Sequence, residues 1–256
     1  MNWESKEILI TIKTYPRTSK KYVETVCTGG VSIKEKRFLR IYPIPFRDLD
    51  QNKQYKKYNI ISANVCKSQD DRRPESYKVD TDTIKIIDWL DSNDKWLKRK
   101  QIVLPLVDKS MCYVLNEQET KDKSLGLIKP ERIDFYSCKA KTEDESDKKM
   151  CYAQLGFFNK SKNEIESVPY EFRYKFFCSG ESACPGHDYM IIDWEIGQAY
   201  RDWSKLYHTE KMLLDKIREK WLTQICASKN DIHFYVGNTK RFRENFMVLG
   251  AFYPPK

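Results

Sequence analysis

The chain has 256 residues, and its 46 basic residues outnumber its 37 acidic residues to give a formal net charge of +9. Because 13% of the residues are aromatic, the chain has enough bulky side chains for a core, which excludes disorder along its whole length. No apolar run approaches the ~18 residues of a membrane-spanning helix, and the first residues lack the basic start and long apolar core of a secretory signal. We therefore expect a cytoplasmic protein without membrane contact, built as one large or two small domains.

Short β-rich segments separated by turns fill the first part of the chain. Alternating apolar and polar residues, bounded by Gly and Pro, predict strands over residues 7–13, 22–27, 37–44, 59–66 and 76–87, a short helix over 88–100 and a strand over 101–107. Five or more short strands with few helices are typical of a small barrel or curled sheet.

A polar segment separates the two parts of the chain. Residues 139–149 contain no apolar side chain beyond Ala140, which predicts an exposed loop or linker. We therefore expect a β-rich, barrel-like domain over residues 1–138 and a second, α+β domain over residues 150–256. The predicted fold class of the whole chain is α+β, mostly β.

The second domain is predicted to combine strands with a long helix. The predicted strands cover residues 150–158, 169–178, 188–195, 232–236 and 246–253. Between Trp203 and Ile225, apolar residues recur at three- and four-residue steps. This spacing predicts one long helix, or two in tandem that are broken near His208.

Cys178, Cys184 and His187 form a C-x5-C-x2-H knuckle around a Pro-Gly turn. Thiolates and imidazole are ligands that zinc prefers, so the knuckle predicts a structural zinc site, although its cysteines are further apart than the usual two to four residues. The alternative is a pair of buried thiols and a turn histidine bonded to the backbone. The sequence leaves the fourth ligand open among Cys138, Cys151, Asp188 and His208.

Asp193 and Glu195 follow directly after the knuckle. In a strand, the two carboxylates would lie on one face and hold Mg²⁺ or Mn²⁺, with His187 as the general base of a metal-dependent nuclease or phosphodiesterase. The alternative is a strand end whose acidic residues cap the following helix. His187 cannot be both a structural zinc ligand and a free base, so the zinc and nuclease hypotheses compete.

Basic and aromatic residues alternate near the N-terminus. Phe38, Arg40 and Tyr42 share one face of the predicted strand 37–44, where they form either a stacking platform for bases or an ordinary amphipathic strand with its rings in the core. Excess positive charge favours polyanionic partners, because neutralised phosphates release counterions. The candidate nucleic-acid-binding residues are Lys13, Arg17, Lys20, Lys21, Arg37, Phe38, Arg40, Tyr42, Arg47, Arg241 and Arg243.

The stretch VCTGG…RFLRIYPIPFRDL, together with CPGHDYMIIDWE, resembles an uncharacterised group of bacterial proteins. Residues 26–47 are also similar to proteins with OB-like domains, in which a Cys-x-Gly turn precedes a strand with aromatic and Arg residues. This resemblance implies an OB- or PUA-like barrel for the first domain. Proteins of this kind are often encoded near mobile-element or antiviral defence genes, which implies a context and assigns no catalytic residue.

The leading hypothesis is an accessory protein that binds DNA or RNA in a mobile-element or antiviral defence system, with a larger protein complex as a further candidate partner. One alternative is a metal-dependent nuclease that uses His187, Asp193 and Glu195, and a second is a protein–protein adaptor. The chain has no P-loop, no GxSxG and no HExxH motif. ATP hydrolysis and serine-hydrolase chemistry therefore lack their usual sequence support.

Overall fold

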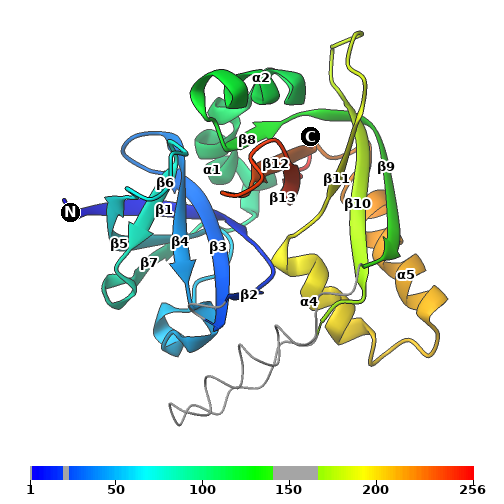
Figure 1. Ribbon diagram of the computed structural model, residues 1–256. Coiled ribbons are helices and arrows are strands. Elements are labelled where there is room, and N and C mark those ends of the chain that lie inside the picture. Colours follow the sequence, from blue (N-terminus) through cyan, green and yellow to red (C-terminus); the bar gives the residue numbers. More distant parts are fainter. Residues whose placement is uncertain (1, 20–22, 141–166) are drawn as a thin grey trace.

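The N-terminal part of the chain forms a closed barrel (Figure 1). The computed structural model describes residues 2–19, 23–140 and 167–256. The barrel strands are β1 (Glu4–Lys13), β3 (Val23–Ser32), β4 (Arg37–Ile44), β5 (Asn59–Lys67) and β6 (Ser76–Val79). β1 pairs with both β3 and β5, and β6 pairs in parallel with β4 and antiparallel with β5, so the order β1–β3–β4–β6–β5 returns to β1. This closed order is that of an OB-like barrel, which confirms the predicted fold class.

The close approach of two paired strands explains one glycine of the barrel. A Cβ atom on Gly30 would lie 2.3 Å from the carbonyl oxygen of Leu9, so β1 and β3 approach as closely as they do only because residue 30 has no side chain. β3 therefore continues through this region to Ser32, beyond the predicted end at residue 27.

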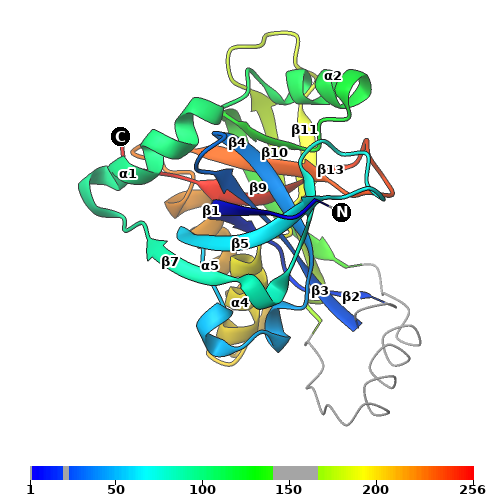
Figure 2. The same ribbon diagram turned by 90° about the vertical axis from the view of Figure 1, so that its left-hand side faces the viewer.

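Two short strands extend the barrel sheet. β2 (Arg17–Ser19) pairs with β3, and β7 (Lys85–Trp89) pairs with β5 at the rim of the barrel (Figure 2). The sequence predicted one strand over residues 76–87, but a 3-10 turn at Thr81–Thr83 divides it into β6 and β7. Two further 3-10 turns lie at Phe46–Asp48 and Gln51–Lys53.

Two helices connect the barrel to the rest of the chain. α1 (Asn93–Val103) is followed by a 3-10 turn at Leu104–Leu106. The predicted strand over residues 101–107 is therefore wrong, because a short apolar run fits a buried helical turn as well as a strand. α2 (Met111–Lys121) begins at Ser110, whose hydroxyl accepts a hydrogen bond from the Tyr113 N–H as an N-cap.

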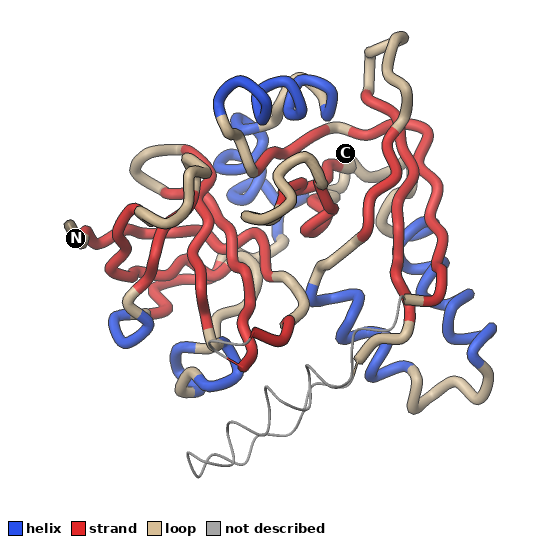
Figure 3. Tube along the Cα trace, in the orientation of Figure 1, coloured by secondary structure: helices blue, strands red, loops and turns tan. Residues whose placement is uncertain are grey.

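Two antiparallel sheets of three strands each follow (Figure 3). One sheet consists of β8 (Leu125–Ile128), β12 (His233–Asn238) and β13 (Phe246–Phe252), and the other of β9 (Pro130–Lys139), β10 (Tyr170–Cys178) and β11 (His187–Met190). β9 and β10 pair across the predicted loop at 139–149. Residues 141–149 of that loop and the predicted strand over 150–158 lie outside the described residues.

The predicted helical segment consists of elements in tandem. α4 (Trp194–Trp203) and α5 (Glu210–Arg218) are separated near His208, and a π-helical turn at Glu219–Gln224 follows α5. Thr209 caps α5 by accepting a hydrogen bond from the Met212 N–H. Among the described residues, the longest apolar helical segments fall short of what a bilayer crossing requires.

One buried cluster joins the barrel to the C-terminal sheets. Leu9 and Ile12 of β1 lie in the same cluster as Leu125 of β8 and Leu249 of β13. Phe38 of β4 packs edge-on against the ring of Tyr235, with centroids 6.2 Å apart. The two parts of the chain therefore share core, and they also enclose a cleft described below.

Candidate metal centre and cleft

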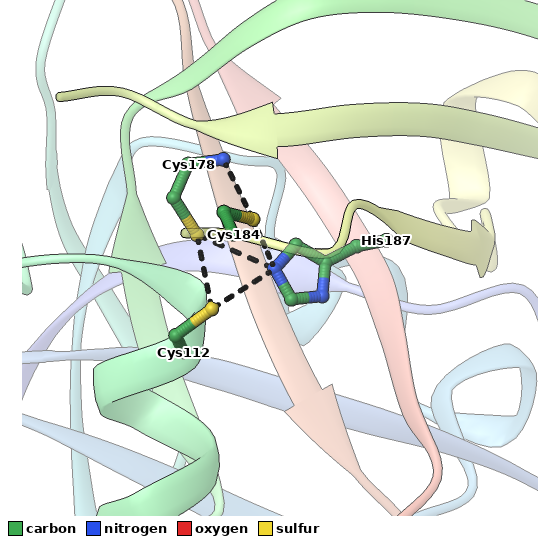
Figure 4. Close-up of side chains that lie close together, drawn as sticks. All are labelled: Cys112, Cys178, Cys184 and His187. Atoms are coloured by element: carbon green, nitrogen blue, oxygen red, sulfur yellow. Dashed lines mark hydrogen bonds between the residues drawn. The ribbon is translucent and has the colours of Figure 1, made fainter. Parts of the chain in front are cut away.

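Cys112, Cys178, Cys184 and His187 point toward one another (Figure 4), and their ligand atoms all lie within 4.8 Å of each other. The His187 Nε2 atom lies 3.3 Å from the sulfurs of both Cys178 and Cys184 and 3.7 Å from the Cys112 sulfur. The sulfurs of Cys112 and Cys178 are 3.7 Å apart. The cluster is partly or fully buried at each of its four residues.

Three elements position these side chains. Cys178 ends β10, His187 begins β11, and Cys184 lies in the turn that connects the two strands. Gly186 in that turn has a φ of +87°, a left-handed conformation that glycine adopts without strain. Cys112 comes from the first turn of α2, where the positive end of the helix dipole favours a thiolate.

The pKa values of the three thiols shift in different directions, because their surroundings differ. Burial raises the pKa of Cys112 and of Cys178, and the neighbouring thiols add to the increase for Cys112. Burial also acts to raise the pKa of Cys184, but N–H groups of Cys178 and Gly186 donate to its sulfur at 3.3 and 3.4 Å, and its pKa is lowered overall. Thiols packed this closely resist ionising together unless a cation lies between them.

Ligand types and spacing both fit zinc. With Zn–S bonds of about 2.3 Å and a Zn–N bond of about 2.0–2.1 Å, tetrahedral zinc places two sulfurs about 3.8 Å apart and a sulfur about 3.5 Å from the nitrogen. The distances of 3.7 Å between sulfurs and 3.3 Å between sulfur and nitrogen lie close to these values. Burial lowers the pKa of His187, which keeps its ring in the neutral form that a metal requires. The cluster is positioned to bind a metal ion such as zinc.

The structure brings together the three predicted ligands and adds Cys112 as the fourth. None of the described candidates for that position belongs to the cluster: Cys138 and His208 are exposed, and the Asp188 carboxylate accepts a hydrogen bond from Arg173 at 2.8 Å. Cys151 lies outside the described residues. Cys112 is not among the ligands proposed from the sequence. The local signal for it is the position of Cys112 in the first turn of a helix, two residues after the N-cap Ser110.

Asp193 and Glu195 do not share a strand face, because α4 begins at Trp194. Asp193 is the N-cap of that helix and accepts a hydrogen bond from the Glu195 N–H, as the capping alternative predicted. Lys57 lies between the two carboxylates, 2.7 Å from Asp193 and 3.1 Å from Glu195. Burial lowers the pKa of Lys57, but the charges of Asp193 and Glu195 outweigh burial and raise it. His187 belongs to the cysteine cluster, so the structure does not bring the predicted nuclease residues together.

A cleft of about 520 Å³ lies between the barrel and the C-terminal strands. From the barrel it is lined by residues of β3 and β4, of the segment after β1 and of the loop between β5 and β6. From the other side it is lined by β13 and by the turn that follows β12, including Lys240 and Arg241. We call this cavity the OB cleft.

Five cationic and two acidic side chains line the OB cleft. Arg73 is neutralised by Asp71 at 2.7 Å and donates to the carbonyl of Asn238 at 2.8 Å, which links the β5–β6 loop to the end of β12. Lys78 pairs with Asp70 at 2.8 Å. Arg40 is the third cation from the barrel, and Lys240 and Arg241 are exposed at the opposite wall.

Only some of the predicted nucleic-acid-binding residues line the OB cleft. Arg40, Tyr42 and Arg241 line the cleft. Phe38 and Arg40 are buried and Tyr42 is exposed, because the C-terminal strands cover part of β4. The three residues therefore do not form an open stacking platform, and Phe38 lies in the core as the amphipathic-strand alternative predicted. The side chain of Arg17, and Lys20 and Lys21 as a whole, lie outside what the structure describes.

The other four predicted residues have partners within the protein. Lys13 lies 4.2 Å from the ring centres of both Phe46 and Trp194, and its pKa is lowered to about 8 by burial and then by the charge of Lys57. The remaining partners are Glu35 and Tyr77 for Arg37, Glu24 for Arg47 and Asp122 for Arg243.

Two family models cover nearly all of the chain. The model described as a domain of unknown function, DUF8758, matches residues 4–105, and the model described as a domain of unknown function, DUF8757, matches residues 107–256. The chain belongs to the DUF8757 family. The metal cluster lies entirely within the DUF8757 region, whereas the OB cleft is lined by residues of both regions. No curated protein matches the sequence.

Proposed function

We propose that this protein binds single-stranded nucleic acid in the OB cleft, and that a structural zinc ion holds its C-terminal part together. The position of the cleft carries the proposal. OB-folds bind oligonucleotides on the face of their second and third strands, between the loop after strand one and the loop after strand four. In this barrel those elements are β3, β4, the segment after β1 and the β5–β6 loop, and all four line the cleft.

The side chains of the cleft support the same ligand class. Tyr15 and Tyr42 supply rings on which bases can stack, and Lys240 and Arg241 supply exposed positive charge for the phosphates. The net charge of +9 also attracts the negatively charged strand from a longer distance. A cleft with walls from two parts of the chain admits a single strand more readily than a duplex, whose grooves are read by protruding elements.

The metal cluster supports a structural role for zinc. All four ligands are protein side chains, which is the arrangement of closed structural sites, whereas catalytic sites keep one position for water or substrate. The pairing of Lys57 with Asp193 and Glu195 favours binding over metal-dependent cleavage, because both carboxylates already have a cationic partner. A role as an accessory subunit in a mobile-element or antiviral defence system remains part of this proposal.

Fluorescence anisotropy with labelled single-stranded DNA and RNA of about ten nucleotides tests the proposal. Binding should weaken with salt, with a log–log slope that becomes smaller by about 0.7 for each phosphate contact removed. We expect Lys240→Ala with Arg241→Ala to weaken binding roughly tenfold and to reduce that slope by about 1.4. The matched control is Lys98→Ala with Lys211→Ala, which removes two exposed lysines from helices that do not line the cleft.

Two results would overturn the proposal. Equal effects of the cleft pair and the control pair would mean that the charge of the whole surface, and not the cleft, attracts nucleic acid. Absence of binding to any strand at 50 mM salt would exclude nucleic acid as the ligand and would favour the adaptor alternative.

A further inference from the structure

Arg40 is a buried arginine that has no carboxylate partner in the part of the chain that the structure describes. Its side chain lines the OB cleft, and the residue is only 4% exposed. One guanidinium nitrogen donates to the Cys27 sulfur at 3.2 Å and another to the Ser124 carbonyl at 3.1 Å, while Nε has no hydrogen-bond partner. Within the described residues, no carboxylate lies within ion-pair distance of Arg40, and the nearby Glu75 is bonded to the N–H and hydroxyl of Ser124 instead.

Arg73 provides a direct comparison in the same cleft. It is 5% exposed, almost as deeply buried as Arg40. Its guanidinium makes three hydrogen bonds to the Asp71 carboxylate, at 2.7, 3.0 and 3.2 Å, and so carries its own counter-charge. Both of these buried arginines line the cleft, but Asp71 neutralises Arg73, whereas Arg40 has no anionic partner among the described residues.

A buried guanidinium keeps its charge, because arginine is not deprotonated in proteins. Without a partner it costs several kcal/mol of desolvation, and a paired anion recovers much of that cost. Arginine's planar fork of donors matches the oxygens of phosphate especially well. Ser76 lies opposite Arg40 in the β4–β6 register and also lines the cleft, so this wall carries a second polar side chain. The surroundings of Arg40 thus fit an anion contributed by the ligand.

The walls of the cleft restrict which phosphate can reach Arg40. The bond from Arg73 to Asn238 links the β5–β6 loop to the C-terminal strands on one side, and Met247 and Leu249 of β13 form the wall on another. An internal phosphodiester needs room for a chain that enters and a chain that leaves. A terminal phosphate needs room on one side only, and a volume of about 520 Å³ lies within the range of pockets for small ligands.

We propose that Arg40 is the base of a phosphate-monoester site, which receives the terminal phosphate of a nucleic-acid strand or the phosphate of a free nucleotide. This inference rests on the proposed function in the case of a strand end, and it stands alone in the case of a free nucleotide. It assigns Lys240 and Arg241 to the rest of the strand and Arg40 to the end group.

The test compares ten-nucleotide strands that carry a phosphate or a hydroxyl at the 5′ end, and a second pair that differs at the 3′ end. We expect a terminal phosphate at one of the two ends to tighten binding about tenfold. Arg40→Met should abolish this preference, so that strands with a terminal phosphate and strands with a terminal hydroxyl bind the variant equally. Because the change removes an uncompensated buried charge, the variant should remain folded, which its thermal unfolding checks. Lys240→Ala with Arg241→Ala should weaken both strands equally and leave the preference intact.

Competition by a nucleoside monophosphate separates the two sources of phosphate. Displacement of the strand by the nucleotide at micromolar concentration, lost in Arg40→Met, would assign the site to free nucleotides as well. If strands bind without preference for either terminal phosphate and the nucleotide does not compete, the site proposal is wrong and the proposed function stands. If the nucleotide binds in calorimetry and no strand does, the site stands and the proposed function is wrong. If neither binds, both fail.

Discussion

The sulfur of Cys112 lies 3.7 Å from the sulfur of Cys178, although 66 positions in the chain separate the two residues. This contact fixes α2 against the end of β10 and completes a set of four ligands. In zinc-finger peptides, the free energy of zinc binding is about 10–16 kcal/mol and contributes to folding. Loss of one ligand should remove a large share of this binding free energy. We therefore expect Cys112→Ser to lose stoichiometric zinc and to lower the free energy of unfolding by about 3 kcal/mol or more.

Elemental analysis and thermal unfolding of the purified protein check this prediction. A loss of 3 kcal/mol corresponds to a fall in Tm of roughly 6–12 °C for a protein of this size. Cys138→Ser is the matched control, because Cys138 is an exposed thiol outside the cluster, and it should keep both zinc and Tm. Full zinc content in Cys112→Ser would show that Cys112 is not a ligand.

The ion pair between Lys57 and Asp193 joins the two family regions in the interior. Asp193 is 3% exposed, so Lys57→Met leaves a buried carboxylate with no adequate partner, which should cost about 3–5 kcal/mol. Asp193→Asn keeps an N-cap oxygen for α4 but removes the charge. We expect the double variant to be more stable than the sum of the two single changes implies. Urea unfolding of the four proteins measures this coupling, and strict additivity would contradict it.

The ion pair between Asp71 and Arg73 should make the free energy of unfolding depend on pH in the acid range. Burial raises the pKa of the Asp71 carboxyl, but the hydrogen bonds and charge of Arg73 outweigh burial and lower it to about 2. Because the folded-state pKa is below the usual 3.8, the stabilisation is complete above pH ~4 and is lost as the pH falls toward 2. Between pH 4 and 2, the free energy of unfolding should therefore fall less in Asp71→Asn than in the wild type. The expected difference between the two proteins is on the order of 1 kcal/mol after allowance for solvent screening.

Chemical unfolding between pH 2 and 5 tests this prediction as a difference between wild type and Asp71→Asn. Acid would release a metal held by the cysteine cluster from both proteins alike, so this effect cancels in the difference. An identical pH dependence in the two proteins would mean that Arg73 does not hold the carboxylate ionised.

Gly197 of α4 packs directly on Tyr15, which lines the OB cleft. A Cβ atom at position 197 would lie 2.2 Å from the tyrosine ring. In an open helix, replacing glycine by alanine stabilises by about 1 kcal/mol, but here we expect Gly197→Ala to destabilise by about 1–3 kcal/mol. In a Tyr15→Ala background the same change should stabilise. Thermal unfolding of the three variants checks the reversal of sign, and an equal effect in both backgrounds would refute the contact.

Local patterns in the sequence predicted those elements whose structure depends on residues close together in the chain. The predicted strand at 37–44 has the bounds of β4, and the three ligands of the knuckle lie within one strand–turn–strand unit. The tandem break near His208 follows from the polar residues around Thr209, which caps α5. In these cases, side-chain periodicity or a turn residue determined the outcome.

Long-range packing determined the features that the sequence did not reveal. Alternation along β4 shows which residues share a face, but it cannot show that Tyr235 and Ser124 cover that face and bury Phe38 and Arg40. The fourth ligand comes from a helix far earlier in the chain, so no spacing rule near Cys178 could find it. The sequence offered the cap at Asp193 as an alternative, but it could not show that Lys57, 136 positions away, pairs with that carboxylate.

The shared hydrophobic cluster has a consequence for how such a protein can evolve. The two family models meet between residues 105 and 107, yet Leu9 on one side and Leu249 on the other are both buried in the same cluster. A gene rearrangement that joined either half to an unrelated domain would leave this apolar patch facing water. Each half therefore needs the apolar surface of the other to keep this cluster away from water, even though sequence comparison divides them.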